Sequence, residues 1–161
     1  KSSDLYAIGC NIAQEAFNEL MFGEKERKMH TLSCYVQMAE YIELAGVDVI
    51  DLSAFKAKLR ELVKECIERD TSVWATSYIC KPSQFVRTKD SVFYSDNRAT
   101  ADYEAEFIVQ TQLDDGTWNI TWDWGIYPNE WALSKNWWKA NVVILNLLYL
   151  REFGDKISVC L

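Results

Sequence analysis

Apolar residues follow a helical period in the first part of the chain and an alternating period after residue 71. Three stretches, residues 4–22, 27–45 and 53–69, repeat apolar positions every three or four residues. Gly23 and Gly46 end the first two stretches, and Ser53 begins the third as an N-cap. The pattern therefore predicts three helices within residues 1–70, the second of them central and covered on more than one side.

Alternation of apolar and polar residues dominates residues 71–126. Residues 72–80 are rich in β-branched and aromatic side chains, and residues 84–87 and 92–94 fit a short hairpin. Residues 101–113 alternate except at Ile108, and the Asp114-Asp115-Gly116 sequence suits a turn. Residues 117–124 alternate again, with Trp118, Trp122 and Trp124 on the side that we expect to face the core. This half of the chain predicts an antiparallel meander of four or five strands.

A long apolar stretch closes the chain. Pro128 suits the first turn of a helix, and residues 137–150 are longer than a typical buried strand, so we expect a buried helix over residues 128–153. A strand over residues 137–150 is the alternative, and residues 157–160 suit an edge strand. The expected fold is a single α+β domain, residues 1–161, with the last helix packed on one face of the sheet.

Composition limits the function classes. The chain has 161 residues, the size of one domain, with 49% hydrophobic residues and a net charge of −7. An isoelectric point near 4.8 disfavours nucleic acid as the main partner and disfavours anionic membrane surfaces, because both need clustered Lys and Arg. The apolar stretch of residues 137–150 is shorter than the roughly 20 residues that span a bilayer.

The five cysteines are odd in number and lack a CxxC spacing, which predicts free thiols and a reducing, cytoplasmic location. The N-terminus shows neither an initiating Met nor a signal segment, which suggests a domain cut from a longer chain. Cys10, His30, Cys34 and Cys66 do not match the spacing of a known zinc site. We therefore predict no metal and no cofactor.

Charge is distributed unevenly. No Lys or Arg lies between Arg98 and Lys135, whereas seven acids do, and on the predicted hairpin several of them share one face. Such a face would attract a basic protein, as an acidic inhibitor or regulator does, with a neighbouring tryptophan as an apolar anchor. The predicted binding residues are Asp102, Glu104, Glu106, Asp114, Asp115, Asp123, Glu130 and Trp131.

Three other interpretations remain open. The acids could form only a solvated face that favours solubility. An aromatic-lined pocket could instead serve a small molecule or an enzyme, lined by Tyr78, Tyr103, Phe107, Trp122 and Trp138. The chain could also be a structural part of a larger assembly. On the predicted open face, Glu104 and Glu106 lack the basic or apolar neighbours that would shift their pKa values, so the sequence predicts no catalytic residue. The oligomeric state stays open.

Overall fold

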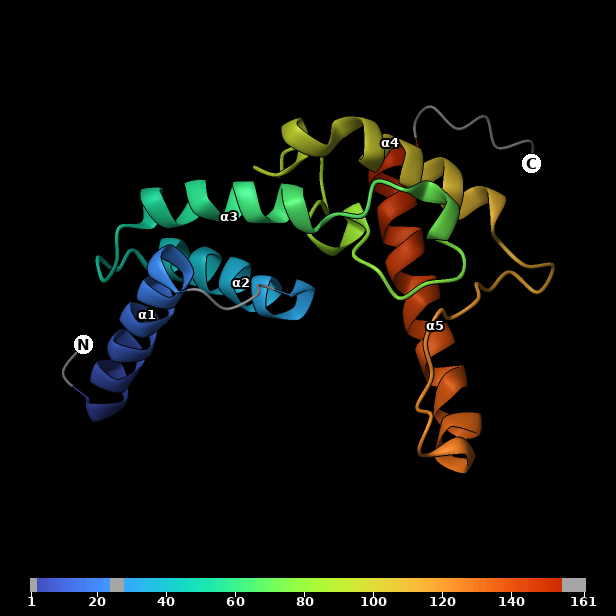
Figure 1. Cartoon of the computed structure of the whole chain (residues 1–161), viewed down its shortest axis with the longest axis horizontal. Coiled ribbons are helices and arrows are strands. Elements are labelled where there is room, and N and C mark those ends of the chain that lie inside the picture. The colour runs from blue at the N-terminus through green and yellow to red at the C-terminus, as the bar shows by residue number, and fades with distance from the viewer. Residues whose placement is uncertain (1–2, 24–27, 155–161) are drawn as a thin grey trace. The chain divides into compact units, whose positions relative to one another are not determined.

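The computed structural model describes residues 3–23 and 28–154, and the chain divides into two compact units, Lys1–Cys66 and Ile67–Leu161 (Figure 1). The boundary lies close to residue 70, where the sequence pattern changes its period. The predicted edge strand at residues 157–160 lies outside the described residues.

The first unit contains the three helices that the pattern predicts. They are α1 (Asp4–Phe22), α2 (Met29–Ala45) and α3 (Leu52–Cys66). The Ser3 hydroxyl accepts the Tyr6 backbone N–H at the start of α1, and Gly46 ends α2 at a φ of 60°, which glycine adopts without strain. The buried stripe of α3 is Phe55, Leu59 and Val63, and α3 packs against both other helices. The three predicted helices are confirmed, but the predicted N-cap Ser53 is wrong: α3 begins at Leu52, and Asp51 accepts the Ala54 N–H as its cap.

The burial of the first unit differs from the expected one. The second apolar stripe of α2 is largely exposed, with Tyr41 68% accessible, so α2 is not covered on two sides. On α1, Leu5, Ile8 and Ile12 are also exposed, and only Ala13 and Leu20 are buried. In a unit of three helices, each helix has fewer neighbours than its apolar residues would suggest.

The second unit is helical, and the predicted sheet is wrong. Across residues 67–154 the structure forms two short 3₁₀ turns, η1 (Thr71–Val73) and η2 (Pro82–Gln84), and two helices, α4 (Tyr94–Gln110) and α5 (Pro128–Phe153). No β-strand occurs in the described parts of the chain. The fold is therefore all-α rather than α+β, and the last helix has no sheet to pack on.

Helix α4 occupies most of the segment that alternates in the sequence. Its buried residues are Asn97, Ala101, Glu104, Ala105 and Ile108, a stripe with helical spacing. Two of these five are polar, so the stripe does not appear in a hydrophobic pattern, whereas the period-two alternation does. Ala, Glu and Gln in this segment also favour helix over strand.

Residues 111–127 form an irregular connection instead of a returning strand. The predicted turn is present: the Gly116 N–H donates to the Leu113 carbonyl (2.8 Å), and Gly116 has a φ of 78°. Trp118 is buried, and its indole N–H donates to the Ile108 carbonyl (2.8 Å), which holds the connection on α4. Trp118 of this connection is thus packed without a strand being formed.

Helix α5 spans the predicted residues 128–153, and Pro128 stands in its first turn. The strand alternative for residues 137–150 is wrong. In Figure 1, α4 crosses the C-terminal part of α5, and the N-terminal part of α5 extends away from α4. Only Ser134, Tyr149 and Phe153 of α5 are buried, so the expectation of a mostly buried helix is also wrong. Among the described residues, no helix has the length and apolar character needed to cross a membrane.

Candidate functional site

The predicted acidic residues do not share a hairpin face. Asp102, Glu104 and Glu106 lie on α4, where Asp102 and Glu106 are about 40° apart and Glu104 points about 160° away from both. Asp114 and Asp115 lie in the turn that follows, Asp123 lies in the irregular connection, and Glu130 lies in the first turn of α5. The helix therefore separates Glu104 from the two acids that a strand would have placed beside it.

Some of these carboxylates are engaged within the protein. Asp102 accepts the Tyr94 hydroxyl (2.8 Å) and lies 3.7 Å from Arg98. Asp115 accepts both the side chain (2.6 Å) and the backbone N–H (2.9 Å) of Thr117, and these bonds lower the pKa of the Asp115 carboxyl. Both residues therefore have a local structural role.

Glu104 is buried, with 2% of its surface accessible. Its two oxygens accept the Ser83 backbone N–H and the Ser83 hydroxyl, each at 2.7 Å, so it joins η2 to α4. Burial raises the pKa of Glu104 from 4.5 to about 7, although the Ser83 hydrogen bonds, the charge of Lys81 and the Tyr149 hydroxyl oppose the rise. The open-face assumption made from the sequence is wrong for this residue.

The neighbours of Glu104 complete a buried polar cluster. Burial lowers the pKa of Lys81, opposed by the Glu104 carboxylate, and the Lys81 ammonium lies 4.8 Å from the Phe107 ring centre. The Tyr149 hydroxyl donates to the Ala101 carbonyl (3.0 Å), and desolvation raises the pKa of Tyr149. Among the described residues, no buried side-chain nitrogen or oxygen lacks a hydrogen-bond partner. The cluster therefore holds η2, α4 and α5 together.

Five aromatic rings form a surface cluster in the second unit. The Trp122 ring centre lies 4.9 Å from Trp131, 5.0 Å from Trp138 and 6.2 Å from Tyr78. Trp124 lies 5.6 Å from Trp131. We call these residues, Tyr78, Trp122, Trp124, Trp131 and Trp138, the aromatic surface. Ring pairs at such distances stabilise one another by about 0.5–1.5 kcal/mol beyond area burial.

The aromatic surface remains partly accessible to solvent. Tyr78 is 53% exposed, and Ile126, two residues after Trp124, is 80% exposed. The predicted Trp131 is half-buried, because its ring packs against Trp122 and Trp124. The backbone N–H of Trp131 donates to the Tyr127 carbonyl (2.9 Å), so the exposed connection leads directly into α5.

Two unpaired acids accompany this surface. Asp123 stands between Trp122 and Trp124 in the chain, and Glu130 directly precedes Trp131. Both residues are exposed, and neither carboxylate makes a hydrogen bond or ion pair with another described residue. Of the predicted binding residues, Trp131 belongs to the aromatic surface, Asp123 and Glu130 adjoin its members along the chain, and the other acids lie on α4 or in its following turn.

The sequence did not predict that these five rings form one surface. Trp122 and Trp124 were expected in the core with Trp118, but only Trp118 is buried. The five residues expected to line a pocket pack in two groups: Tyr103 and Phe107 against the buried Trp74, and Tyr78 and Trp138 against Trp122. The signal in the sequence was the density of tryptophans, which does not distinguish core from surface.

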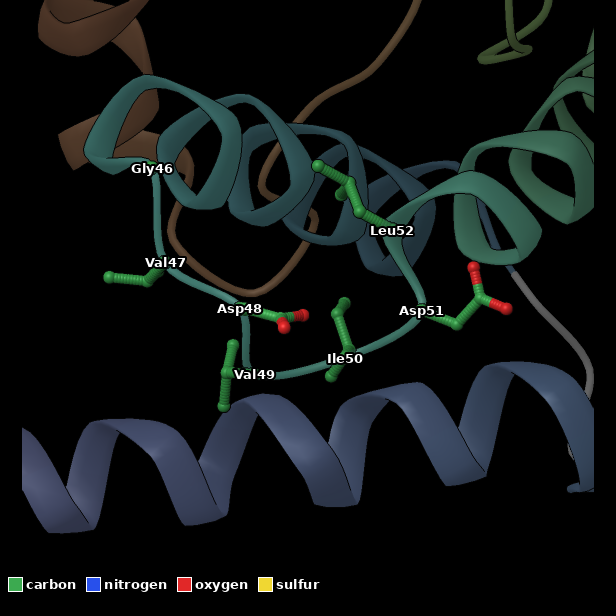
Figure 2. A pocket seen from close by; sticks show the side chains of 7 residues that line it. All are labelled: Gly46, Val47, Asp48, Val49, Ile50, Asp51 and Leu52. Atoms are coloured by element: carbon green, nitrogen blue, oxygen red, sulfur yellow. The ribbon is translucent and has the colours of Figure 1, made fainter.

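A hollow lies beside the loop between α2 and α3 (Figure 2). Seven consecutive residues, 46–52, line it, so it does not gather side chains from separate elements. Asp51 already accepts the Ala54 N–H (2.9 Å) as a cap of α3. This hollow follows from the path of the loop, and the aromatic surface remains the candidate site.

No group of three or more metal-ligating side chains comes together within residues 3–23 and 28–154. The four described cysteines, Cys10, Cys34, Cys66 and Cys80, are free thiols. A scan against protein-family models, a search of curated proteins and a search of solved structures found no match to this chain. The candidate site therefore depends on its own geometry.

Proposed function

We propose that this protein is a macromolecular interaction domain that binds a basic protein segment through the aromatic surface and the adjoining carboxylates Asp123 and Glu130. The observation that carries the proposal is the meeting of partly exposed rings with unpaired acids. Aromatic faces attract Lys and Arg side chains, and nearby carboxylates add charge complementarity. By occupying the basic residues of its partner, the domain would act as an inhibitor or regulator.

The charge of the chain supports this partner class. No Lys or Arg lies between Arg98 and Lys135, and the whole chain carries a net charge of −7. Such a potential accelerates the approach of a basic protein and weakens with salt. A cytoplasmic location belongs to the same proposal and is supported by the four free thiols.

The test uses a defined probe, a synthetic 12-residue peptide in which arginine and leucine alternate. We expect its addition to shift the indole NMR signals of Trp122, Trp124 and Trp131 before other signals. The double substitution Asp123→Asn with Glu130→Gln should weaken peptide binding roughly 10-fold, because both carboxylates contact the peptide cations. A peptide with glutamate in place of arginine should not bind.

The matched control removes the same charge elsewhere. Glu106 and Asp114 are also exposed and unpaired among the described residues, but they lie on α4 and in its following turn. Glu106→Gln with Asp114→Asn should weaken binding less than about 2-fold, through net charge alone. Equal weakening by both pairs, or indole signals that do not move, would contradict the proposed surface.

A further inference from the structure

Helix α5 has a second, outward-facing apolar stripe that the proposed function does not use. Leu133, Trp137, Ala140, Ile144 and Leu147 are spaced by four, three, four and three residues. All five are exposed: Leu133 61%, Trp137 68%, Ile144 58% and Leu147 54%, with Ala140 exposed as well. We call these five residues the outer seam. Its spacing is that of the a and d positions of a coiled coil.

The outer seam lies on the side of α5 away from its own unit. At 100° per residue, its five members fall within about 80° around the helix, and the Trp131 and Tyr149 positions fall on the other side. Tyr149 and Phe153 are buried, and Trp131 packs on Trp122. Tyr149, Phe153 and Trp131 are therefore packed within the chain, although Leu145 on the same side stays 55% exposed, and the outer seam exposes about 21 Å of apolar stripe to water.

The residues beside the seam are uncharged. The positions that flank a and d are occupied by Ser134, Asn136, Asn141, Val143, Leu148 and Leu150. In coiled coils, like charges at these positions prevent self-pairing. Although the chain carries a net charge of −7, no like-charge repulsion opposes the approach of two outer seams along their length.

The charges stand at the two ends of the seam and have opposite signs. Continuing the same spacing, Glu130 precedes Leu133 and Arg151 follows Leu147, and both are exposed without a hydrogen bond or ion pair among the described residues. A second helix in parallel would place Glu130 beside Glu130 and align the two helix dipoles unfavourably. An antiparallel second copy brings Glu130 of one helix to the Arg151 end of the other.

We propose that the protein forms an antiparallel homodimer through the outer seams of two α5 helices. In this register Trp137 lies opposite the second copy's Leu147 and Arg151 lies opposite its Leu133, and the small Ala140 faces the larger Ile144. At each end, Glu130 of the second copy then stands about 4.5 Å along the helix axis from Arg151 of the first. The rings of the aromatic surface take no part in this interface, whereas Glu130 belongs both to it and to the proposed partner site.

The first experiment measures the mass of the whole chain by sedimentation equilibrium from about 1 to 100 µM. We expect a dimer in this range. Ile144→Glu should raise the dissociation constant at least ~100-fold, because a charge would be buried opposite Ala140 of the second copy. Val92→Glu is the matched control: Val92 is 53% exposed in the same unit but is not part of α5, and its substitution should leave the mass unchanged.

The second experiment tests the orientation. Glu130→Arg alone and Arg151→Glu alone should each weaken the dimer about 10-fold, and the double variant should restore it, because the opposite charges again meet at the ends. A double variant no tighter than the single variants would overturn the antiparallel arrangement.

A chain that stays monomeric at 100 µM, or a dimer that is insensitive to Ile144→Glu, would overturn the proposal altogether. Circular dichroism of each variant establishes that α5 still folds. Because Ile144→Glu leaves the aromatic surface intact, it should retain binding of the arginine–leucine peptide. Loss of the dimer and loss of partner binding are thus distinguishable.

Discussion

Helices α4 and α5 use polar and apolar residues in opposite ways. Helix α4 buries Asn97 and Glu104 and supplies each with hydrogen-bond partners from its own chain. Helix α5 leaves Trp137 and Ile144 in water, and the described residues offer nothing to cover them. The buried polar groups of α4 have all their hydrogen-bond partners within the chain, whereas the apolar stripe of α5 contacts only solvent. The comparison teaches that α4 holds the unit together and α5 is available to another molecule.

The sharpest test of this comparison truncates one residue on each helix. Glu104→Ala should lower the free energy of unfolding of the second unit by about 3 kcal/mol at pH 5, because it leaves both Ser83 donors without their acceptor and opens a cavity. The measurement is urea unfolding followed by fluorescence.

Its counterpart on α5 is Ile144→Ala. At a concentration where the chain is monomeric, this substitution should change the free energy of unfolding by less than about 0.5 kcal/mol, since Ile144 is 58% exposed. Equal losses of stability at the two positions would contradict the view that α4 stabilises the unit and that the outer seam of α5 does not.

Proton binding at Glu104 should make the stability depend on pH. Its pKa is about 7 in the folded chain against an ordinary 4.5, so between these pH values the folded state holds a proton that the unfolded state releases. The contribution is full below pH 4.5 and is lost as the pH rises through about 7, at most by ~3 kcal/mol. The neutral Glu104→Gln variant should lack this decline.

The measurement compares unfolding free energies of the parent and of Glu104→Gln from pH 4.5 to 8. We expect the variant to gain on the parent as the pH rises. Curves that stay parallel would mean that the burial of Glu104 does not control its proton affinity, and would weaken the view of α4 as the helix with a satisfied interior.

A smaller effect is expected where α5 meets α4. Tyr149→Phe removes the hydroxyl that donates to the Ala101 carbonyl (3.0 Å) and leaves the ring stacked on Phe153. We expect a loss of about 1 kcal/mol in urea unfolding. The control Tyr127→Phe removes an exposed hydroxyl and should have no measurable effect. A loss of several kcal/mol would mean that the buried cluster depends on Tyr149 more than on Glu104.

The helices with apolar inner faces could be predicted from the sequence, and α4 could not. In α3, the buried stripe consists of the apolar residues Phe55, Leu59 and Val63, whose helical spacing is visible in the sequence. In α4 the corresponding positions include Asn97 and Glu104, whose burial depends on partners from other segments, Arg69 and Ser83, that no local pattern contains. A period of two fitted the remaining residues better, and the predicted sheet followed from that misreading.

The candidate site was predicted in part for the same reason. Trp131 and its neighbouring acid were recognised from local sequence, because an aromatic residue beside a carboxylate is visible there. The rings that surround Trp131 come from the connection before α5 and pack by tertiary contact. Alternation in residues 117–124 suggested an inner face, but with no strand formed only Trp118 became buried.

The boundary at Cys66 and Ile67 has a practical consequence for spectroscopy. All seven tryptophans, from Trp74 to Trp138, belong to the second unit, so tryptophan fluorescence does not report the unfolding of the first unit. Far-ultraviolet circular dichroism, in contrast, reports the helices of both. Recording the two signals on one denaturation series separates the melting of residues 1–66 from that of residues 67–161 without any label: coincident curves mean one cooperative transition, and displaced curves mean two.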